Sequence, residues 1–309
     1  MSDTTILLVG HGSRERAGND EIEHFTAHWR EQHPAWRIEL CFIEFAEVEL
    51  EEGLERAAQG AGRVIVAPLI LNAAGHVRTE IPGHIARARL RWPQVQFDYA
   101  PHLGACEPVL QILLRQLRAC MQSLDMPDPR NTGVILLGRG SSDRQANGEV
   151  AKLARWIWEE GEHELVDIAF TGITHPRLEL AVQRQVALGM KQIIVLPYYL
   201  FTGTLMQRIQ RQMQHLAQQY PQIRFAHGRY FGFEPEIGRL LSERVQGLLD
   251  GGQSPVHIPA EAAAWESHHH GHDHGHAHHH SHEHDHDHAH AHDHAHGCGH
   301  EHTARSKCL

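Results

Sequence analysis

Short apolar runs alternate with amphipathic segments along most of the chain. In its first part, strand-length runs rich in Val, Ile and Leu are TILLV, RIELCFI, RVIVAPLIL and QFDYA. The segments between and after them place apolar residues at helical spacing: NDEIEHFTAHWREQH, EVELEEGLERAAQG, VRTEIPGHIARARL and CEPVLQILLRQLRAC. Strands without a polar face that alternate with helices predict a parallel sheet covered on both sides. We therefore expect an α/β, doubly wound fold.

The same pattern occurs twice. TILLVGHGSRERAGN, at residues 5–19, aligns with GVILLGRGSSDRQAN, at 133–147, and the alignment continues through RVIVAPLIL with KQIIVLPYYL and HLGACEP with YFGFEP. Self-similarity of this length indicates duplicated domains. We expect one domain at 1–124, a linker at 125–132 whose Pro, Asp and Asn favour open chain, and a second domain at 133–250.

The last part of the chain, 251–309, has a different composition. Of the 31 histidines, 19 lie between His268 and His302, mixed with Asp, Glu, Gly and Ala. Such a low-complexity segment has no apolar face to bury, so we expect a linker and a disordered, metal-binding tail.

Composition excludes several classes of protein. No apolar run approaches the roughly 20 residues that a membrane helix needs, and the N-terminal apolar stretch is too short for a signal peptide. Outside the tail, 26 basic residues stand against 30 acidic ones, which does not indicate a nucleic-acid surface. The chain has five cysteines, and no two of them have CxxC spacing. This usage argues for a reducing compartment. We expect a cytoplasmic protein without nucleic-acid or membrane partners, either a monomer or a weak dimer.

Three metal-ligating residue types follow successive strands of the first domain. His11 follows the first strand, Glu44 ends the second, and His76 lies in the loop after the third. Ligands of open parallel sheets gather beyond the carboxyl ends of the strands, so these side chains can converge. Two imidazoles and a carboxylate suit a divalent ion such as cobalt, iron, nickel or zinc. The alternative is that the histidines cap strands and Glu44 faces solvent.

The glycine turn around His11 also has an alternative interpretation as a phosphate-binding loop. The third glycine of the dinucleotide fingerprint is missing, because Glu15 and Asp143 stand at its position in the two domains. We therefore expect no nucleotide. In the second domain, the three candidate ligands are replaced together, by Arg139, Gly172 and either Thr204 or Leu205. This pattern predicts a metal site in the first domain alone.

LLVGHGSR, FIEFAE and PLILNAAGHVRTEIP, in this order, resemble the sirohydrochlorin cobaltochelatases of the chelatase superfamily. The similarity is to their long form, which has two fused homologous domains and a histidine-rich C-terminal region, and which is related to ferrochelatases. The resemblance implies ATP-independent insertion of Co²⁺ into the tetrapyrrole sirohydrochlorin, on the route to cobalamin. It also implies that His11, Glu44 and His76 are both the metal ligands and the catalytic residues.

The anionic substrate of this family implies further contacts. Ser13, Arg14, Arg78 and Arg139 lie near strand ends, where guanidinium groups can pair with the substrate's carboxylates. Some long forms carry a cluster-binding CxxC motif near the tail. Here Cys298 and Cys308 are too far apart for it, so we do not expect an iron–sulfur cluster.

Other functions stay open at the level of sequence. The same ligands accept Fe²⁺ or Ni²⁺, so a sirohydrochlorin ferrochelatase that makes sirohaem is one alternative. A non-enzymatic nickel or cobalt metallochaperone, acting through its histidine-rich tail, is another. Tetrapyrrole binding distinguishes the chaperone, and competition between Co²⁺ and Fe²⁺ distinguishes the two chelatases.

Overall fold

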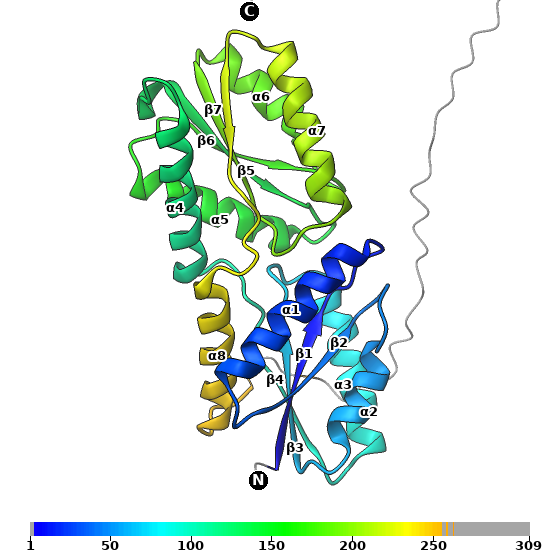
Figure 1. Cartoon of the computed structure of the whole chain (residues 1–309). Helices are drawn as coiled ribbons and strands as arrows, with labels where there is room; N and C mark the ends of the chain where they lie inside the picture. Colours follow the sequence, from blue (N-terminus) through cyan, green and yellow to red (C-terminus); the bar gives the residue numbers. More distant parts are fainter. Residues whose placement is uncertain (1–2, 255–257, 259–261, 263–309) are drawn as a thin grey trace, which may run out of the picture. The chain divides into compact units, whose positions relative to one another are not determined.

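The computed structural model describes residues 3–254, 258 and 262 (Figure 1). The histidine-rich tail and its expected disorder lie outside the described residues. In the first half of the chain the elements are β1 (Thr4–Gly10), α1 (Arg16–Gln32), β2 (Arg37–Phe42), α2 (Leu50–Ala58), β3 (Arg63–Pro68), the π-helical turn η1 (His76–Glu80), α3 (Ile81–Arg91), β4 (Gln96–Tyr99) and α4 (Glu107–Ser123).

The second half repeats this order. It contains η2 (Pro129–Asn131), β5 (Thr132–Gly138), α5 (Arg144–Glu160), β6 (Val166–Phe170), α6 (Leu178–Ala187), β7 (Gln192–Pro197), α7 (Thr204–Gln219), β8 (Arg224–His227) and α8 (Pro235–Leu249). Each half forms a four-stranded sheet, with strand orders β2-β1-β3-β4 and β6-β5-β7-β8, and all pairs are parallel. The predicted α/β fold with two homologous parallel-sheet domains is confirmed.

The central strands explain why the sheets are covered on both faces. Every residue of β5 is buried, and β1 is buried from its second residue onward, because neither strand has a polar face. The carboxyl ends of β1 and β3 lie side by side, since Val9 pairs with Pro68. The chain leaves β1 through the turn before α1 and leaves β3 through the loop after Pro68, so polar side chains of the two connections can meet at this edge of the sheet.

The last helix of each half packs on the other half. Helix α4 contacts β7, β8 and α5, whereas α8 contacts β3 and α4 (Figure 1). Hydrogen bonds hold α8 to the first half: Trp29 Nε1 donates to Ser242 Oγ over 2.9 Å, and Arg63 Nη2 donates to the Leu248 carbonyl over 2.9 Å. Both helices thus pack across the predicted linker at 125–132. The domain boundaries stay a prediction that rests on the sequence repeat.

Candidate metal centre

The turn that carries His11 is held by the same hydrogen bonds in both halves. The Ser13 amide donates to Asn19 Oδ1 over 2.8 Å, and Asn19 Nδ2 donates to the Ser13 carbonyl over 2.9 Å. In the second half, Ser141 and Asn147 make the same two bonds over 2.9 and 2.8 Å. The repeated asparagine therefore fixes the direction in which the chain leaves the strand, and with it the side chain at position 11 or 139.

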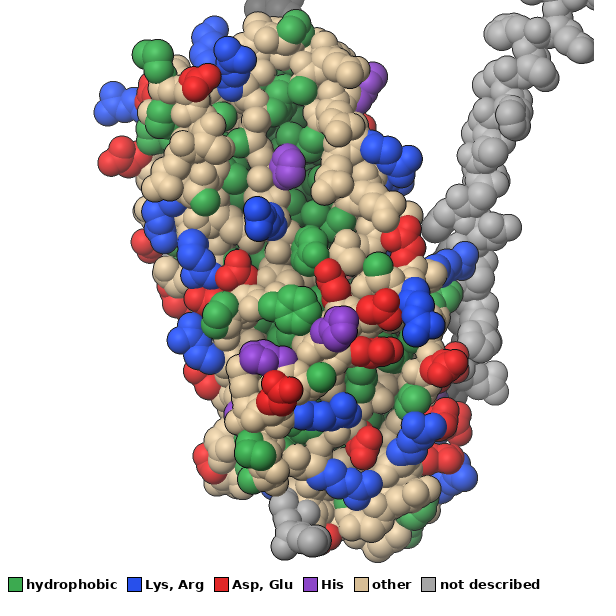
Figure 2. All heavy atoms as spheres, viewed as in Figure 1, with side chains coloured by type: hydrophobic (Ala, Val, Ile, Leu, Met, Phe, Trp, Pro, Cys, Tyr) green, Lys and Arg blue, Asp and Glu red, His purple; other side chains and the backbone are tan. Residues whose placement is uncertain are grey.

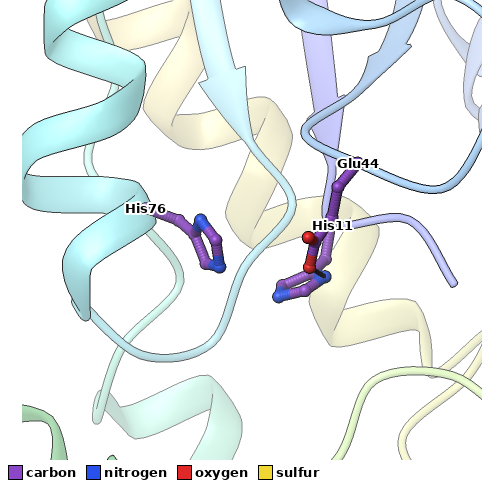
Figure 3. Close-up of side chains that lie close together, drawn as sticks. All are labelled: His11, Glu44 and His76. Atoms are coloured by element: carbon purple, nitrogen blue, oxygen red, sulfur yellow. Dashed lines mark ion pairs between the residues drawn. The ribbon is translucent and has the colours of Figure 1, made fainter. Parts of the chain in front are cut away.

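The structure brings the three predicted ligands together at the carboxyl ends of β1, β2 and β3 (Figure 3). One ligand atom from each of His11, Glu44 and His76 lies within 4.8 Å of the others. The two imidazoles meet edge to face, with ring centroids 4.8 Å apart, and His11 Nδ1 lies 3.7 Å from Glu44 Oε1. Among the described residues, these three form the group of His, Cys, Asp and Glu side chains that could hold a metal ion.

Gly12 allows the loop of Glu44 to approach the turn of His11. Its φ is 87°, and a Cβ atom there would lie 1.7 Å from the Glu44 carbonyl oxygen. Any side chain would push the two segments apart, and the positive φ is strained for residues other than glycine. The Glu44 amide in turn donates to the His11 carbonyl over 3.2 Å. The relative position of the two ligands is thus set by backbone contacts.

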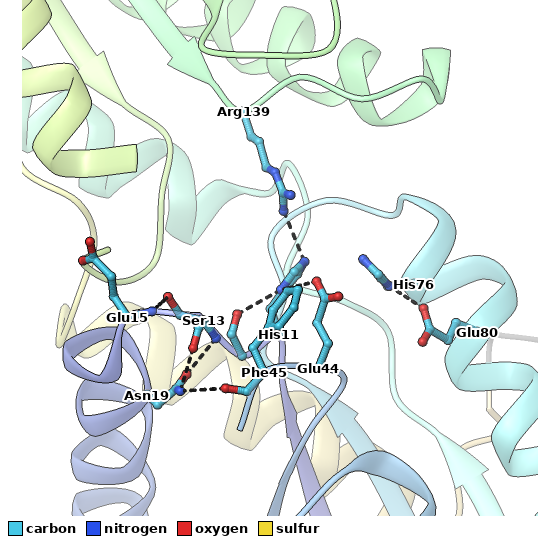
Figure 4. A network of polar contacts seen from close by, with 10 residues as sticks. His11, Ser13, Glu15, Asn19, Glu44, Phe45, His76, Glu80 and Arg139 are labelled. Carbon is cyan, nitrogen blue, oxygen red and sulfur yellow. Dashed lines mark hydrogen bonds and ion pairs between the residues drawn. The ribbon is translucent and has the colours of Figure 1, made fainter. Parts of the chain in front are cut away.

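Glu80 is a site residue that the sequence analysis missed. His76 begins the π-helical turn η1, so the side chain four residues later lies on the same face, and His76 Nδ1 is 2.5 Å from Glu80 Oε2 (Figure 4). A carboxylate at Nδ1 leaves Nε2 as the nitrogen for a metal and fixes the orientation of the ring. The i,i+4 spacing of His and Glu was the available signal, but the predicted helix began one residue too late to show it.

Burial and charge keep His11 neutral. Desolvation, together with the nearby His76 and Arg139, lowers the pKa of His11 to about 4. Burial raises the pKa of Glu44 above its usual value. Burial acts in the same direction on Glu80, but the hydrogen bond and charge of His76 outweigh it and lower the pKa of that carboxyl. At neutral pH the centre therefore offers the neutral imidazole of His11, which can bind a metal. It also offers the anionic carboxylate of Glu80, which orients the imidazole of His76.

Arg139 reaches the centre from the second half. Its Nη1 atom lies 3.2 Å from Nε2 of His11, while Nδ1 of the same ring lies 3.1 Å from the Gly12 carbonyl oxygen (Figure 4). The carbonyl can only accept and the guanidinium can only donate, so this arrangement places the ring proton on Nδ1 and the lone pair on Nε2. The residue that replaces His11 in the second half thus contacts His11 itself.

The other predicted substrate contacts have partners within the protein. Ser13 Oγ accepts from the Glu15 amide over 3.1 Å, the Arg14 guanidinium lies 4.8 Å from the ring centroid of Phe45, and Arg78 Nη1 donates to an oxygen of Asp143 over 3.1 Å. Ser13 therefore supports the turn, and Arg78 links the halves. Their roles in substrate binding, and the catalytic roles of the three ligands, stay predictions.

The second half repeats the frame of the centre without its ligands. The Gly172 amide donates to the Arg139 carbonyl over 2.9 Å, which matches the bond between Glu44 and His11. Helix α7 begins at Thr204, where η1 begins at His76, and neither Thr204 nor Leu205 offers an imidazole. Residues that align in the sequence repeat thus occupy equivalent positions in the structure.

Comparisons with known proteins agree with this duplication. The family model described as CbiX matches residues 5–120 and again 133–248. A sirohydrochlorin cobaltochelatase of Priestia megaterium is 36% identical over 248 residues, which cover 80% of each chain, and a sirohydrochlorin ferrochelatase of the same organism is 30% identical over 82% of this chain and 94% of its own.

A solved structure shows the same architecture. The structure described as SirB from Bacillus subtilis with Fe³⁺ superposes with a TM-score of 0.71 and 29% identity, over 84% of this chain and all of that one. No helix in the described part of the chain is both long and apolar enough to cross a membrane. With family matches in both halves and a relative of 36% identity that is similar along most of its length, the chain belongs to the CbiX family.

Proposed function

We propose that this protein is a sirohydrochlorin chelatase that inserts Co²⁺ into the tetrapyrrole without ATP. The observation that carries the proposal is the cluster of His11, Glu44 and His76, whose ligand atoms lie within 4.8 Å of one another at the carboxyl ends of three neighbouring strands. Its relatives in the CbiX family are chelatases of sirohydrochlorin by name, which supports the same substrate here.

The residues suit the chemistry of metalation. The reaction exchanges two protons on ring nitrogens for one divalent metal ion, so the site needs exchangeable nitrogen and oxygen ligands and groups that accept protons. Imidazole and carboxylate bind such ions less tightly than thiolate does, which permits transfer to the ring. His11 is neutral and offers Nε2, and Glu44 takes up a proton more readily than an ordinary carboxylate, because burial raises its pKa.

The anionic rim of the substrate accounts for the basic residues around the centre. In this proposal a substrate carboxylate accepts hydrogen bonds from Arg139 and takes its guanidinium away from His11, 3.2 Å distant in the free protein. Arg14, on the loop beside Phe45, is placed to bind a second carboxylate. Binding of the tetrapyrrole would thereby expose the lone pair of His11 to the incoming metal.

A direct assay tests the activity. The full chain, sirohydrochlorin and Co²⁺ are mixed without nucleotide, and the absorbance of the tetrapyrrole is followed. We expect cobalt-sirohydrochlorin, detected by its absorbance spectrum, to form much faster with the protein than without it. A chain that bound Co²⁺ but left the tetrapyrrole unbound would instead support a nickel or cobalt metallochaperone.

The choice of metal needs a second assay, because a ferrochelatase is among the similar proteins. Equal concentrations of Co²⁺ and Fe²⁺ compete for sirohydrochlorin under anaerobic conditions, and the two products are quantified. We expect cobalt-sirohydrochlorin to predominate. Predominance of sirohaem would identify the alternative, a ferrochelatase with the same site.

We also propose that the histidine-rich segment from His268 to His302 stores metal ions for the centre. Dense imidazoles bind Co²⁺, Ni²⁺ and Zn²⁺ at several weak sites. A chain that ends at Ser267 should bind fewer equivalents of Co²⁺ in equilibrium dialysis while it keeps metalation at saturating Co²⁺. Equal binding by the two chains would disprove storage. The cytoplasmic location stays a prediction.

A further inference from the structure

Two equivalent loops bond to the turns of His11 and Arg139, one in each half. We call them the rim loops, residues 43–48 after β2 and residues 171–176 after β6. Each is closed by the same backbone bond: Phe42 N donates to the Val48 carbonyl, and Phe170 N donates to the Pro176 carbonyl, both over 2.9 Å. The loops thus have the same length and the same closure, although their sequences, IEFAEV and TGITHP, differ.

At the same position, each rim loop exposes a large apolar side chain on a left-handed backbone. Phe45 has a φ of 59° and is 46% exposed, and Ile173 has a φ of 62° and is 58% exposed. A positive φ is uncommon for residues other than glycine and is an outlier for a β-branched residue such as Ile. In both loops an apolar side chain therefore stands where glycine would be unstrained and a polar side chain would be better solvated.

Contacts beneath the loops fix this backbone. A Cβ atom on Gly12 would lie 1.7 Å from the Glu44 carbonyl oxygen, and one on Gly140 would lie 2.2 Å from that of Gly172. Asn19 Nδ2 also donates to the Phe45 carbonyl over 3.3 Å. These contacts are made with the main chain of the loops and do not involve the side chains of Phe45 and Ile173.

Both residues directly follow, in the chain, residues that belong to the metal centre or bond to Arg139 beside it. Phe45 directly follows the ligand Glu44, and its carbonyl accepts a hydrogen bond from Asn19, which also bonds the turn of His11 (Figure 4). Ile173 directly follows Gly172, whose amide bonds the carbonyl of Arg139, the residue that contacts His11. Figure 2 shows one face of the molecule, on which hydrophobic and histidine side chains lie among charged ones.

We propose that Phe45 and Ile173 contact the conjugated macrocycle of the substrate, one from each half of the chain. This inference rests on the proposed chelatase function. A tetrapyrrole has an apolar ring and an anionic rim, and such ligands are bound by apolar side chains against the ring with a few polar groups at the rim. Arg14, whose guanidinium lies 4.8 Å from the centroid of the Phe45 ring, and Arg139 supply rim contacts beside the two apolar residues.

Asparagine and leucine variants separate the apolar contact from the backbone conformation. Asn tolerates the left-handed region, so Phe45→Asn and Ile173→Asn keep the loop while they remove the apolar surface. Phe45→Leu and Ile173→Leu keep an apolar side chain. Leu188→Asn is the matched control, because Leu188 is an apolar side chain that is 67% exposed at the end of α6, away from the rim loops.

Two binding measurements are made on each full-length variant: sirohydrochlorin without metal, by fluorescence titration, and Co²⁺ without sirohydrochlorin, by its visible spectrum. Loss of one apolar contact should raise the Kd for sirohydrochlorin about tenfold in each Asn variant. The Leu variants should recover most of this loss. Binding of Co²⁺ should stay unchanged in both Asn variants, and Leu188→Asn should match the wild type in both titrations.

The outcomes separate this inference from the proposed function. If the wild type binds sirohydrochlorin and both Asn variants bind it within about twofold, the inference is wrong and the chelatase proposal stands. The same holds if the Asn variants change only the self-association of the chain in sedimentation. If the wild type does not bind sirohydrochlorin at all, the chelatase proposal fails and the inference fails with it.

Discussion

At the scale of single residues, His11 Nε2 is the atom of the metal centre that a residue of the second half contacts. Arg139 Nη1 lies 3.2 Å from it, so the guanidinium and a metal ion cannot use the same lone pair at once. The neighbouring positive charge also contributes to the lowered pKa of His11. Arg139 therefore opposes metal binding in the free protein and, in the proposed function, assists it once an anionic substrate has bound.

Replacement of Arg139 by Ala should change the two affinities in opposite directions. Co²⁺ alone should bind several times more tightly, because a competing donor and a positive charge are removed. The KM for sirohydrochlorin should rise about tenfold, because a charged hydrogen bond to a carboxylate is lost. Calorimetry with Co²⁺ and metalation kinetics measure the two effects. Weaker binding of Co²⁺ in the variant would contradict this role.

The lowered pKa of His11 also predicts how stability depends on pH. Below pH 6.5 the unfolded chain takes up a proton at His11, whereas the folded chain resists protonation until about pH 4. Stability is therefore lost as the pH falls through this window. Between pH 7 and pH 5 the wild type should lose on the order of 1–2 kcal/mol more than His11→Asn in urea unfolding. Equal losses would mean that His11 titrates normally.

At the scale of elements, the centre depends on the turn between β1 and α1. His11 and Arg139 stand at equivalent positions of the sequence repeat, and so do Asn19 and Asn147. This repeat was enough to predict two equivalent strand-to-helix turns, because strand ends and glycines are local features. The start of η1 at His76 was not predictable, because helix ends depend on tertiary contacts. The pairing of His76 with Glu80 was missed for this reason.

Gly12 and Gly75 form a matched pair of substitutions within the site. Gly12→Ala should cost at least about 2 kcal/mol in urea unfolding, because its φ is 87° and the added Cβ would lie 1.7 Å from the Glu44 carbonyl oxygen. Gly75 has a φ of −47° and nothing within 4 Å of an added Cβ, so Gly75→Ala should change stability by no more than about 1 kcal/mol. Equal stability of the two variants would show that the close approach is not required.

At the scale of the whole molecule, the two repeats are not independent packing units, since α4 and α8 are exchanged between them. The duplication was predicted from the similarity of the two halves in sequence, and the α/β class from periodicity, which reports local structure and burial. The exchange was not predicted, because both helices are amphipathic and the apolar pattern does not show which sheet each helix covers. The distance between Arg139 and His11 depends on how the two halves pack, which periodicity does not report.

The exchange predicts that residues 1–132 alone do not form a stable monomer. Without α8 the fragment loses its bonds from Trp29 to Ser242 and from Arg63 to Leu248, and apolar surface beside β3 becomes exposed. Circular dichroism should show a much lower Tm for the fragment than for the full chain, and addition of residues 133–254 should raise it. A monomeric fragment with the Tm of the full chain would contradict this packing.

The central claim is that His11 and His76 carry out metalation at one centre, and single substitutions test it most directly. His11→Ala and His76→Ala are mixed with sirohydrochlorin and Co²⁺, and the absorbance change is compared with that of the wild type. We expect each variant to lose at least about 100-fold in the rate of metal insertion while it keeps the wild-type fold by circular dichroism. Full activity in both variants would contradict the assignment of the centre.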